Sequence, residues 1–258
     1  FGAAAAVRAL VGASRPRRLA SFDPDLLLDY RARRPTVTIS EGTSTRLAWQ
    51  EIQLLAGRDL EGRDVCLLVG PEPDLRWREF SRAVAELAGE LSVRLAVGLG
   101  AFPAPAPHTR PVRLAATSTD AELAARVGVV SGTLEVPAGI EAVLEHALAQ
   151  AGVPAVGLWA RVPHYVAAMP YPAASAALVD GLCQLAGLAF DSSGLHAAAD
   201  EARRRVDSLI AQSAEHTQMV RQLEASIDAA EGNPLDLGEI PSGDQIAAEL
   251  ERYLRGEG

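Results

Sequence analysis

Short apolar runs alternate with segments of helical period through the middle of the chain, and this alternation restricts the fold more than any other feature. The strand-like runs cover residues 64–69, 93–99, 111–117 and 153–162, and the helical patterns cover residues 74–91, 137–151 and 172–188. Strands that alternate with helices at this spacing form crossover units, which favour parallel pairing with helices on both faces of the sheet. We therefore predict an α/β fold built on a largely parallel sheet with flanking helices.

Three further segments extend this pattern. Thr36–Ser40 and Arg46–Leu55 flank a Glu-Gly-Thr-Ser sequence, which predicts a β-hairpin. Thr119–Glu122 resembles a capping box that opens a short helix. A helical pattern covers Ala3–Gly12. Because an α/β domain normally places a strand before such a helix, we expect a strand to precede it.

The last quarter of the chain has a different character. From Leu195 to Glu231, apolar and small residues recur in alternating steps of four and three, which predicts one long helix. Alanines, a serine and a histidine dilute this stripe, so it suits packing on a neighbouring helix of the same chain or oligomer. Ser242–Asp244 then caps a final amphipathic helix, which we expect to fold back as a helical hairpin. The predicted domains are an α/β core over residues 1–190 and a helical appendage over residues 191–258.

The charge composition excludes several classes of function. The net charge is −9 and all 24 basic residues are arginine, which rules out a P-loop lysine and Schiff-base chemistry. An acidic chain repels phosphate backbones, so we expect no nucleic-acid partner. No apolar run approaches the ~20 residues that span a bilayer, so we expect no membrane association. Cys66 and Cys183 lie in apolar contexts and predict buried thiols of a cytoplasmic protein.

No motif assigns a reaction. The chain has no Gly-x-Ser-x-Gly elbow, no His-Glu-x-x-His and no paired cysteine motif. Gly98 and Gly100 follow a predicted strand, but Pro103 occupies the third position of a dinucleotide-binding glycine motif. We therefore predict no metal site and no cofactor. The catalytic residues stay unassigned, and whether the protein is an enzyme stays open.

Polar side chains gather where the predicted strands end. These candidate site residues are Glu72, Arg76, Trp77, His108, Thr109, Arg110, His164 and Tyr165. Because parallel strands carry their carboxyl ends to one edge of a sheet, we expect the charged groups, the histidines and Tyr165 to converge in one cleft. Arginine and histidine there would suit a small anionic ligand. The alternative is structural: His108 and Arg110 tie down a proline-rich loop, while Trp77 and Tyr165 pack.

Several motifs follow one another in a fixed order. They are Gly70–Trp77 (GPEPDLRW), Pro107–Pro111 (PHTRP), Val136–Ile140 (VPAGI), Val162–Tyr165 (VPHY) and the tail from Pro241 to Arg255. In this order and spacing they resemble the PAC2 family, the relatives of proteasome assembly chaperone 2, in its actinobacterial branch. Two departures are visible: Ala138 stands where a threonine is common, and Phe1-Gly2 lacks the usual initial strand and tryptophan.

The resemblance implies a core similar to nucleoside phosphorylases, a C-terminal helical appendage and a homo-oligomer, expected to be a trimer. Eukaryotic relatives bind proteasome subunits, so it also implies an assembly-chaperone-like role with a protein client. The alternative, from fold alone, is a nucleoside- or phosphate-handling enzyme with its site at the strand ends. We favour protein binding, because the sequence shows no nucleophile, metal site or phosphate cradle.

Overall fold

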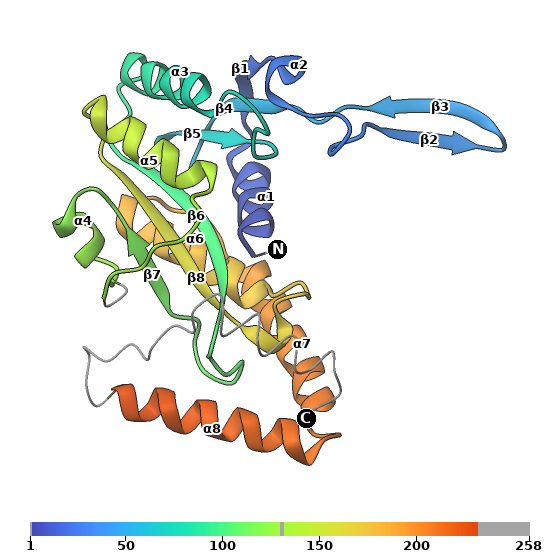
Figure 1. Ribbon diagram of the computed structural model, residues 1–258, viewed down its shortest axis with the longest axis vertical. Coiled ribbons are helices and arrows are strands. Elements are labelled where there is room, and N and C mark those ends of the chain that lie inside the picture. The colour runs from blue at the N-terminus through green and yellow to red at the C-terminus, as the bar shows by residue number, and fades with distance from the viewer. Residues whose placement is uncertain (1, 130–131, 232–258) are drawn as a thin grey trace.

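The computed structural model describes residues 2–129 and 132–231, which form a mixed α/β structure (Figure 1). The helices are α1 (Gly2–Ser14), α2 (Pro24–Leu27), α3 (Trp77–Glu90), α4 (Ala121–Ala125), α5 (Ile140–Gln150), α6 (Pro172–Ala186), α7 (Ser193–Ile210) and α8 (Ala214–Glu231). The strands are β1 (Arg17–Phe22), β2 (Thr36–Ser40), β3 (Thr43–Ala48), β4 (Ile52–Arg58), β5 (Asp64–Val69), β6 (Ala96–Ala104), β7 (Leu114–Thr117) and β8 (Ala155–Pro163). A 3-10 turn, His164–Val166, follows β8. No helix in these residues has the length and apolar character needed to cross a membrane.

The central sheet has the order β6-β8-β7, with β8 in the middle. β6 and β8 run parallel, in register from Ala96 opposite Ala155 to Ala104 opposite Pro163. β7 runs antiparallel to β8. All three predicted strands are confirmed, although β6 starts later than expected and continues into the proline-rich segment.

The expected largely parallel sheet is not confirmed, because β6–β8 is the single parallel pair among the described strands. The reason lies in the connection between β6 and β7. Residues 105–113 join these strands without a helix, and a parallel neighbour needs a crossover of roughly a dozen residues or more. The chain therefore turns back into β7. A nucleoside-phosphorylase-like core is likewise not confirmed.

β1, β4 and β5 form a separate antiparallel sheet. β5 fills the predicted strand, but it is not the continuously buried strand that its apolar run indicates, since one face is largely open. Cys66 on this face is exposed, which corrects the expectation of a buried thiol; Cys183 on α6 is half-buried. An edge strand of an antiparallel sheet can face water on one side, and here Asp64 and Cys66 do so.

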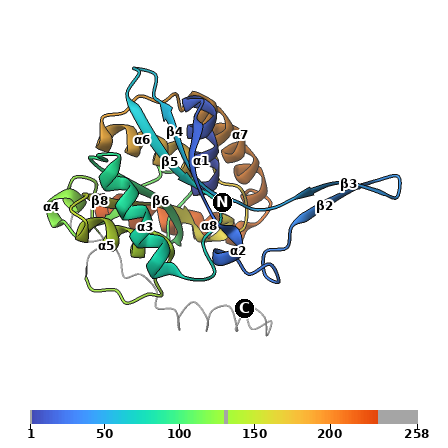
Figure 2. The same ribbon diagram turned by 90° about the horizontal axis from the view of Figure 1, so that it is seen from above.

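Helices cover both faces of the central sheet (Figure 2). α1, α6 and α7 pack on one face, where the main core cluster contains the fully buried Leu158 and Leu178 and, from α7, Val206. α3 and α5 pack on the other face through a smaller cluster that includes Leu148 and Val153. The sheet is therefore the middle layer of three, and its strand ends emerge between the helices.

β2 and β3 form a hairpin that projects away from the body of the protein (Figures 1 and 2). The predicted hairpin is confirmed, with a shorter second strand, since β3 ends at Ala48 and β4 begins at Ile52. Glu41 and Gly42 form the turn, both with positive φ (48° and 80°), which matches the right-handed twist of the flanking strands.

The prediction of a single helix from Leu195 to Glu231 is wrong. Helix α7 ends at Ile210, and a second helix, α8, starts at Ala214. Ser213 explains the break. Its hydroxyl accepts a hydrogen bond from the backbone N–H of His216 (3.3 Å), which is the bond of a helix N-cap. A serine inside an apolar stripe thus acts as a helix start. The final helix expected from Ser242 onward lies outside the described residues.

Substitutions in the stripe test this packing. Val206 is buried, whereas Leu209, the next stripe position, is 55% exposed. We expect Val206→Asp to lower the free energy of unfolding by about 3 to 5 kcal/mol, because it buries an unpaired charge. Leu209→Asp is the matched control and should change it by less than about 0.5 kcal/mol. Urea unfolding measures both; equal effects would show that α7 does not pack as described.

Candidate functional site

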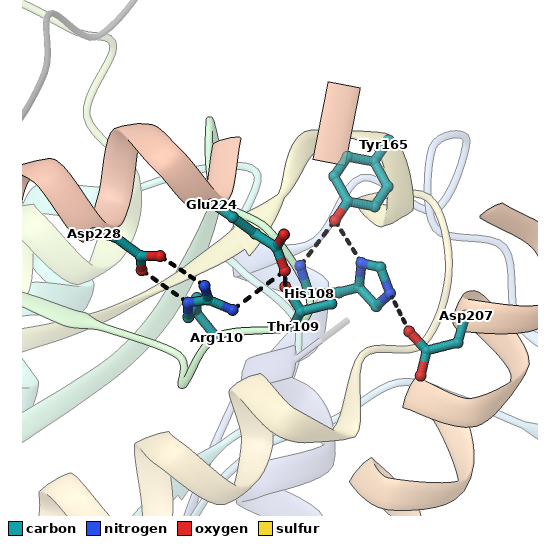
Figure 3. A network of polar contacts seen from close by, with 7 residues as sticks. All are labelled: His108, Thr109, Arg110, Tyr165, Asp207, Glu224 and Asp228. Carbon is teal, nitrogen blue, oxygen red and sulfur yellow. Dashed lines mark hydrogen bonds and ion pairs between the residues drawn. The ribbon is translucent and has the colours of Figure 1, made fainter. Parts of the chain in front are cut away.

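His108 is the centre of a polar network at the end of the central sheet (Figure 3). It follows β6, and its side chain is only 2% exposed. The Tyr165 hydroxyl, from the turn after β8, lies 2.8 Å from the backbone N of His108 and 2.7 Å from its Nδ1. His108 Nε2 lies 2.9 Å from Asp207 Oδ1 on α7.

The donors and acceptors around His108 match completely. The Asp207 carboxylate can only accept, so it assigns the ring hydrogen to Nε2. Nδ1 then accepts from the Tyr165 hydroxyl, whose oxygen accepts the backbone N–H of His108. Burial raises the pKa of Tyr165, and the carboxylates of Glu224 and Asp207 add to the rise, which keeps the phenol protonated as this pattern requires.

The two residues after His108 bind α8. Thr109 Oγ1 donates to Glu224, and Arg110 Nη1 lies 3.2 Å from the same carboxylate. Arg110 also holds Asp228 with two bonds, Nε to Oδ1 at 2.8 Å and Nη2 to Oδ2 at 2.7 Å. These bonds hold the pKa of the Asp228 carboxyl below its usual range. The paired geometry is that of bidentate arginine–carboxylate recognition.

We call these seven residues the strand-end network: His108, Thr109, Arg110, Tyr165, Asp207, Glu224 and Asp228 (Figure 3). It joins the loop after β6, the turn after β8, and both α7 and α8. The three carboxylates were not predicted from the sequence. Glu224 and Asp228 stand one helical turn apart and so share a face, but nothing in the sequence identifies the loop that they contact.

The predicted site residues do not all meet. His164 is exposed and joins the network only through its ring edge against Tyr165 (centroids 5.3 Å apart). Glu72 accepts from the backbone N of Ile140 at the start of α5 (2.6 Å), and Arg76 pairs with Glu79. Trp77 Nε1 donates to the carbonyl of Pro73, also away from the network.

The single cleft is therefore corrected to two separate locations. The prediction assumed that β5 runs parallel to β6 and β8 in one sheet. β5 belongs instead to the antiparallel sheet and pairs with β4, so its carboxyl end is not delivered to the same edge. Glu72, Arg76 and Trp77 organise the β5–α3 loop and the start of α5.

A small cavity adjoins the strand-end network, between the loop after β6 and helices α6 and α7. Its volume is about 170 Å³, and its lining includes His108, Arg110, Tyr171 and Arg203. Small-molecule sites typically measure roughly 300 to 1,000 Å³, so this cavity is small for a nucleoside. In the residues that the structure describes, no three His, Cys, Asp or Glu side chains are placed to hold a metal ion.

The chain is similar to a family model and to several solved structures. The model described as "PAC2 family" matches residues 3–210. A protein of unknown function from Corynebacterium glutamicum is 33% identical with a TM-score of 0.84, the match covering 90% of this chain and 86% of that one. No curated protein matches the chain.

Two further neighbours have informative names. The Mycobacterium tuberculosis proteasome-assembly chaperone homologue is 32% identical with a TM-score of 0.78, over 85% of this chain and 93% of that one. A PAC2 family protein from Streptomyces avermitilis is 34% identical with a TM-score of 0.76, again over 85% and 93% of the two chains.

Tyr165→Phe tests whether the strand-end network stabilises the fold. The substitution keeps the ring but leaves the backbone N–H and Nδ1 of His108 without their partner, so we expect a loss of about 1 to 3 kcal/mol in the free energy of unfolding. Tyr30→Phe is the matched control, because the Tyr30 hydroxyl makes an exposed bond with Asp25. Denaturant titration compares the two. A Tyr165→Phe protein as stable as the control would contradict a structural network.

Proposed function

The chain belongs to the PAC2 family, and on this premise we propose that it is a protein-binding homo-oligomer with an assembly-chaperone-like role. The name of the Mycobacterium tuberculosis relative, a proteasome-assembly chaperone homologue at 32% identity, supports this role. The clients of such a protein are other protein chains.

The observation that carries the proposal is the hairpin arm, residues 36–48. Val37, Ile39 and Leu47 are 47%, 64% and 53% exposed. Val37 lies opposite Leu47 in the register, and Ile39 is two residues further along β2, so the three side chains share one face. A contiguous exposed apolar face of this kind marks an interaction site.

The backbone of the arm also favours an interaction with a partner. β2 and β3 pair only with each other among the described strands, so each has an open outer edge. An isolated two-stranded hairpin is marginally stable in water, and open edges are normally protected by proline, lysine or inward charges. Here Arg46 is the one charged residue in the two strands. A partner that covers the arm would both stabilise it and remove this exposure.

We propose a closed trimer as the oligomer and the cytoplasm as its compartment. In a closed ring with cyclic symmetry, the arm of each copy contacts the same surface of a neighbouring copy. The family resemblance seen in the sequence motifs favours three copies. The free thiols of Cys66 and Cys183 are typical of a reducing compartment.

The polar groups on which nucleoside or phosphate chemistry would depend are already engaged. His108 and Arg110 contact carboxylates of α7 and α8. Arg76 pairs with Glu79, and Glu72 accepts from the start of α5. We therefore do not propose an enzymatic role.

Light scattering during gel filtration tests the oligomer and the arm together. At micromolar concentration the protein should elute with three times the chain mass of 27.1 kDa. Ile39→Glu should reduce this mass while leaving the far-UV circular dichroism of the chain unchanged, since Ile39 lies outside the core clusters of the described residues. Thr38→Glu, on the opposite face of the arm, is the control. A monomeric wild-type protein contradicts the oligomer, and an intact Ile39→Glu trimer contradicts the role of the arm.

Affinity capture from native cytoplasm tests the client. We expect defined protein partners to be recovered in stoichiometric amounts with the wild-type chain and to resist washing at 0.3 M salt, roughly the ionic strength at which surface charge pairs are screened. Heat-denatured protein on the same resin gives the background. Recovery of nothing above that background would contradict the chaperone-like role while leaving the oligomer untouched.

A further inference from the structure

The first turn of α5 places a carboxyl directly on the central sheet, at a point where both strands lack side chains. Gly98 of β6 and Gly157 of β8 are direct partners in the register. A Cβ on Gly98 would lie 2.3 Å from Oε1 of Glu141 and 2.6 Å from its Cγ, and a Cβ on Gly157 would lie 2.7 Å from Oγ1 of Thr117. Gly98 therefore leaves the space that Glu141 occupies, whereas Gly157 leaves space first for Thr117 and the Trp159 indole, with Oε1 of Glu141 3.2 Å from its Cβ position.

A second carboxyl lies one helical turn further along α5. Glu145 is buried and accepts a hydrogen bond from Thr117 Oγ1 (2.8 Å), which itself accepts from Trp159 Nε1 (3.0 Å). Oε1 of Glu141 is also buried, but it has no hydrogen-bond partner. A buried oxygen without a partner is costly, and much more so when it carries charge.

Among the described residues, no positively charged side chain is paired with Glu141. α5 contributes Glu145, and the β5–α3 loop contributes Glu72, which takes the first backbone N–H of the helix. β7 contributes only the hydroxyl of Thr117, β6 and β8 contribute glycines and Trp159, and α3 contributes apolar side chains. Neither Glu141 nor Glu145 has an ion pair among the described residues.

Burial, followed by the charge of Glu145, raises the pKa of Glu141 to about 7. The N-terminal end of a helix favours a negative charge, but that effect is smaller than the cost of burial here. Because the carboxyl of an unfolded chain titrates near 4.5, the folded chain loses stability as the pH rises from about 4.5 to about 7.

We propose that Glu141 is a proton-controlled clamp. While its carboxyl is protonated, the first turn of α5 packs on the backbone of β6 and β8 at Gly98 and Gly157, and loss of the proton releases that turn. The segment that would move with it, residues 132–139, is exposed along its whole length. It carries the exposed side chains of Leu134 and Val136. The clamp would therefore change the apolar surface beside α5 with pH. This device is independent of the proposed chaperone-like role.

Trp159 reports on the clamp, because its indole is bonded to the Thr117 hydroxyl that contacts Glu145. In the full-length chain with Trp49→Phe and Trp77→Phe, we expect Trp159 fluorescence to change with a midpoint near pH 7. Glu141→Gln should abolish the change, since the amide cannot ionise. Glu145→Gln should lower the midpoint by removing the like charge. Glu135→Gln, in the exposed segment, is the matched control and should leave the midpoint unchanged.

Hydrogen exchange of the amides in residues 140–144, corrected for the intrinsic effect of pH, should become faster above pH 7 in the wild-type chain and not in Glu141→Gln. Carboxyl ¹³C NMR of the wild-type protein reads the same titration without any substitution, so the test holds even where a variant fails to fold. A Glu141 midpoint below pH 5.5, or a fluorescence midpoint that persists in Glu141→Gln, would overturn the proposal. A titrating Glu141 without faster exchange would also overturn it, because the helix turn would then stay seated.

Discussion

The parallel pairing of β6 with β8 determines where both polar clusters lie. Its register aligns the two strands over nine residue pairs, so the loop after β6 and the turn after β8 emerge side by side. His108 and Tyr165 therefore meet at one end. The same register puts Gly98 beside Gly157 near the other end, where Glu141 lies on bare backbone. One ladder of hydrogen bonds thus positions a satisfied polar network and an unsatisfied carboxyl on one sheet.

The strand-end network and the hairpin arm divide the polar and apolar interactions of the protein between them. At the strand ends, carboxylates from α7 and α8 neutralise Arg110 and orient His108, so the charged groups are used within the chain. The arm, in contrast, offers an apolar face that no described part of the chain covers. The interaction surface that we propose therefore lies on the arm, whereas the strand ends connect the core to the C-terminal helices.

Local patterns predicted the elements but not their pairing. β8 and α6 were predicted to within two residues at each end, because long apolar runs bounded by proline and glycine leave few alternatives. The direction of β7 was missed, since it depends on the length of a loop, and the break before α8 was missed because Ser213 fits an apolar stripe as well as a helix cap. Of the site, His108, Thr109, Arg110 and Tyr165 were found by their place after strands. The carboxylates that bind His108, Thr109 and Arg110 lie about a hundred residues further along the chain. The burial of Glu141 was missed because it depends on glycines of β6 and β8, which are far from Glu141 in the sequence.

The bonds from Arg110 to Asp228 have a consequence for biosynthesis. They join residues 118 positions apart, and at ~5 to 20 residues per second a ribosome needs roughly 6 to 24 s to make the intervening chain. The sheet can pair once β8 is complete at Pro163, and from then until α8 is made the partners of Arg110 on α8 are missing. The nascent protein thus presents His108 and Arg110 to its surroundings before it can enclose them, and translation of α8 marks the moment at which that end of the domain closes.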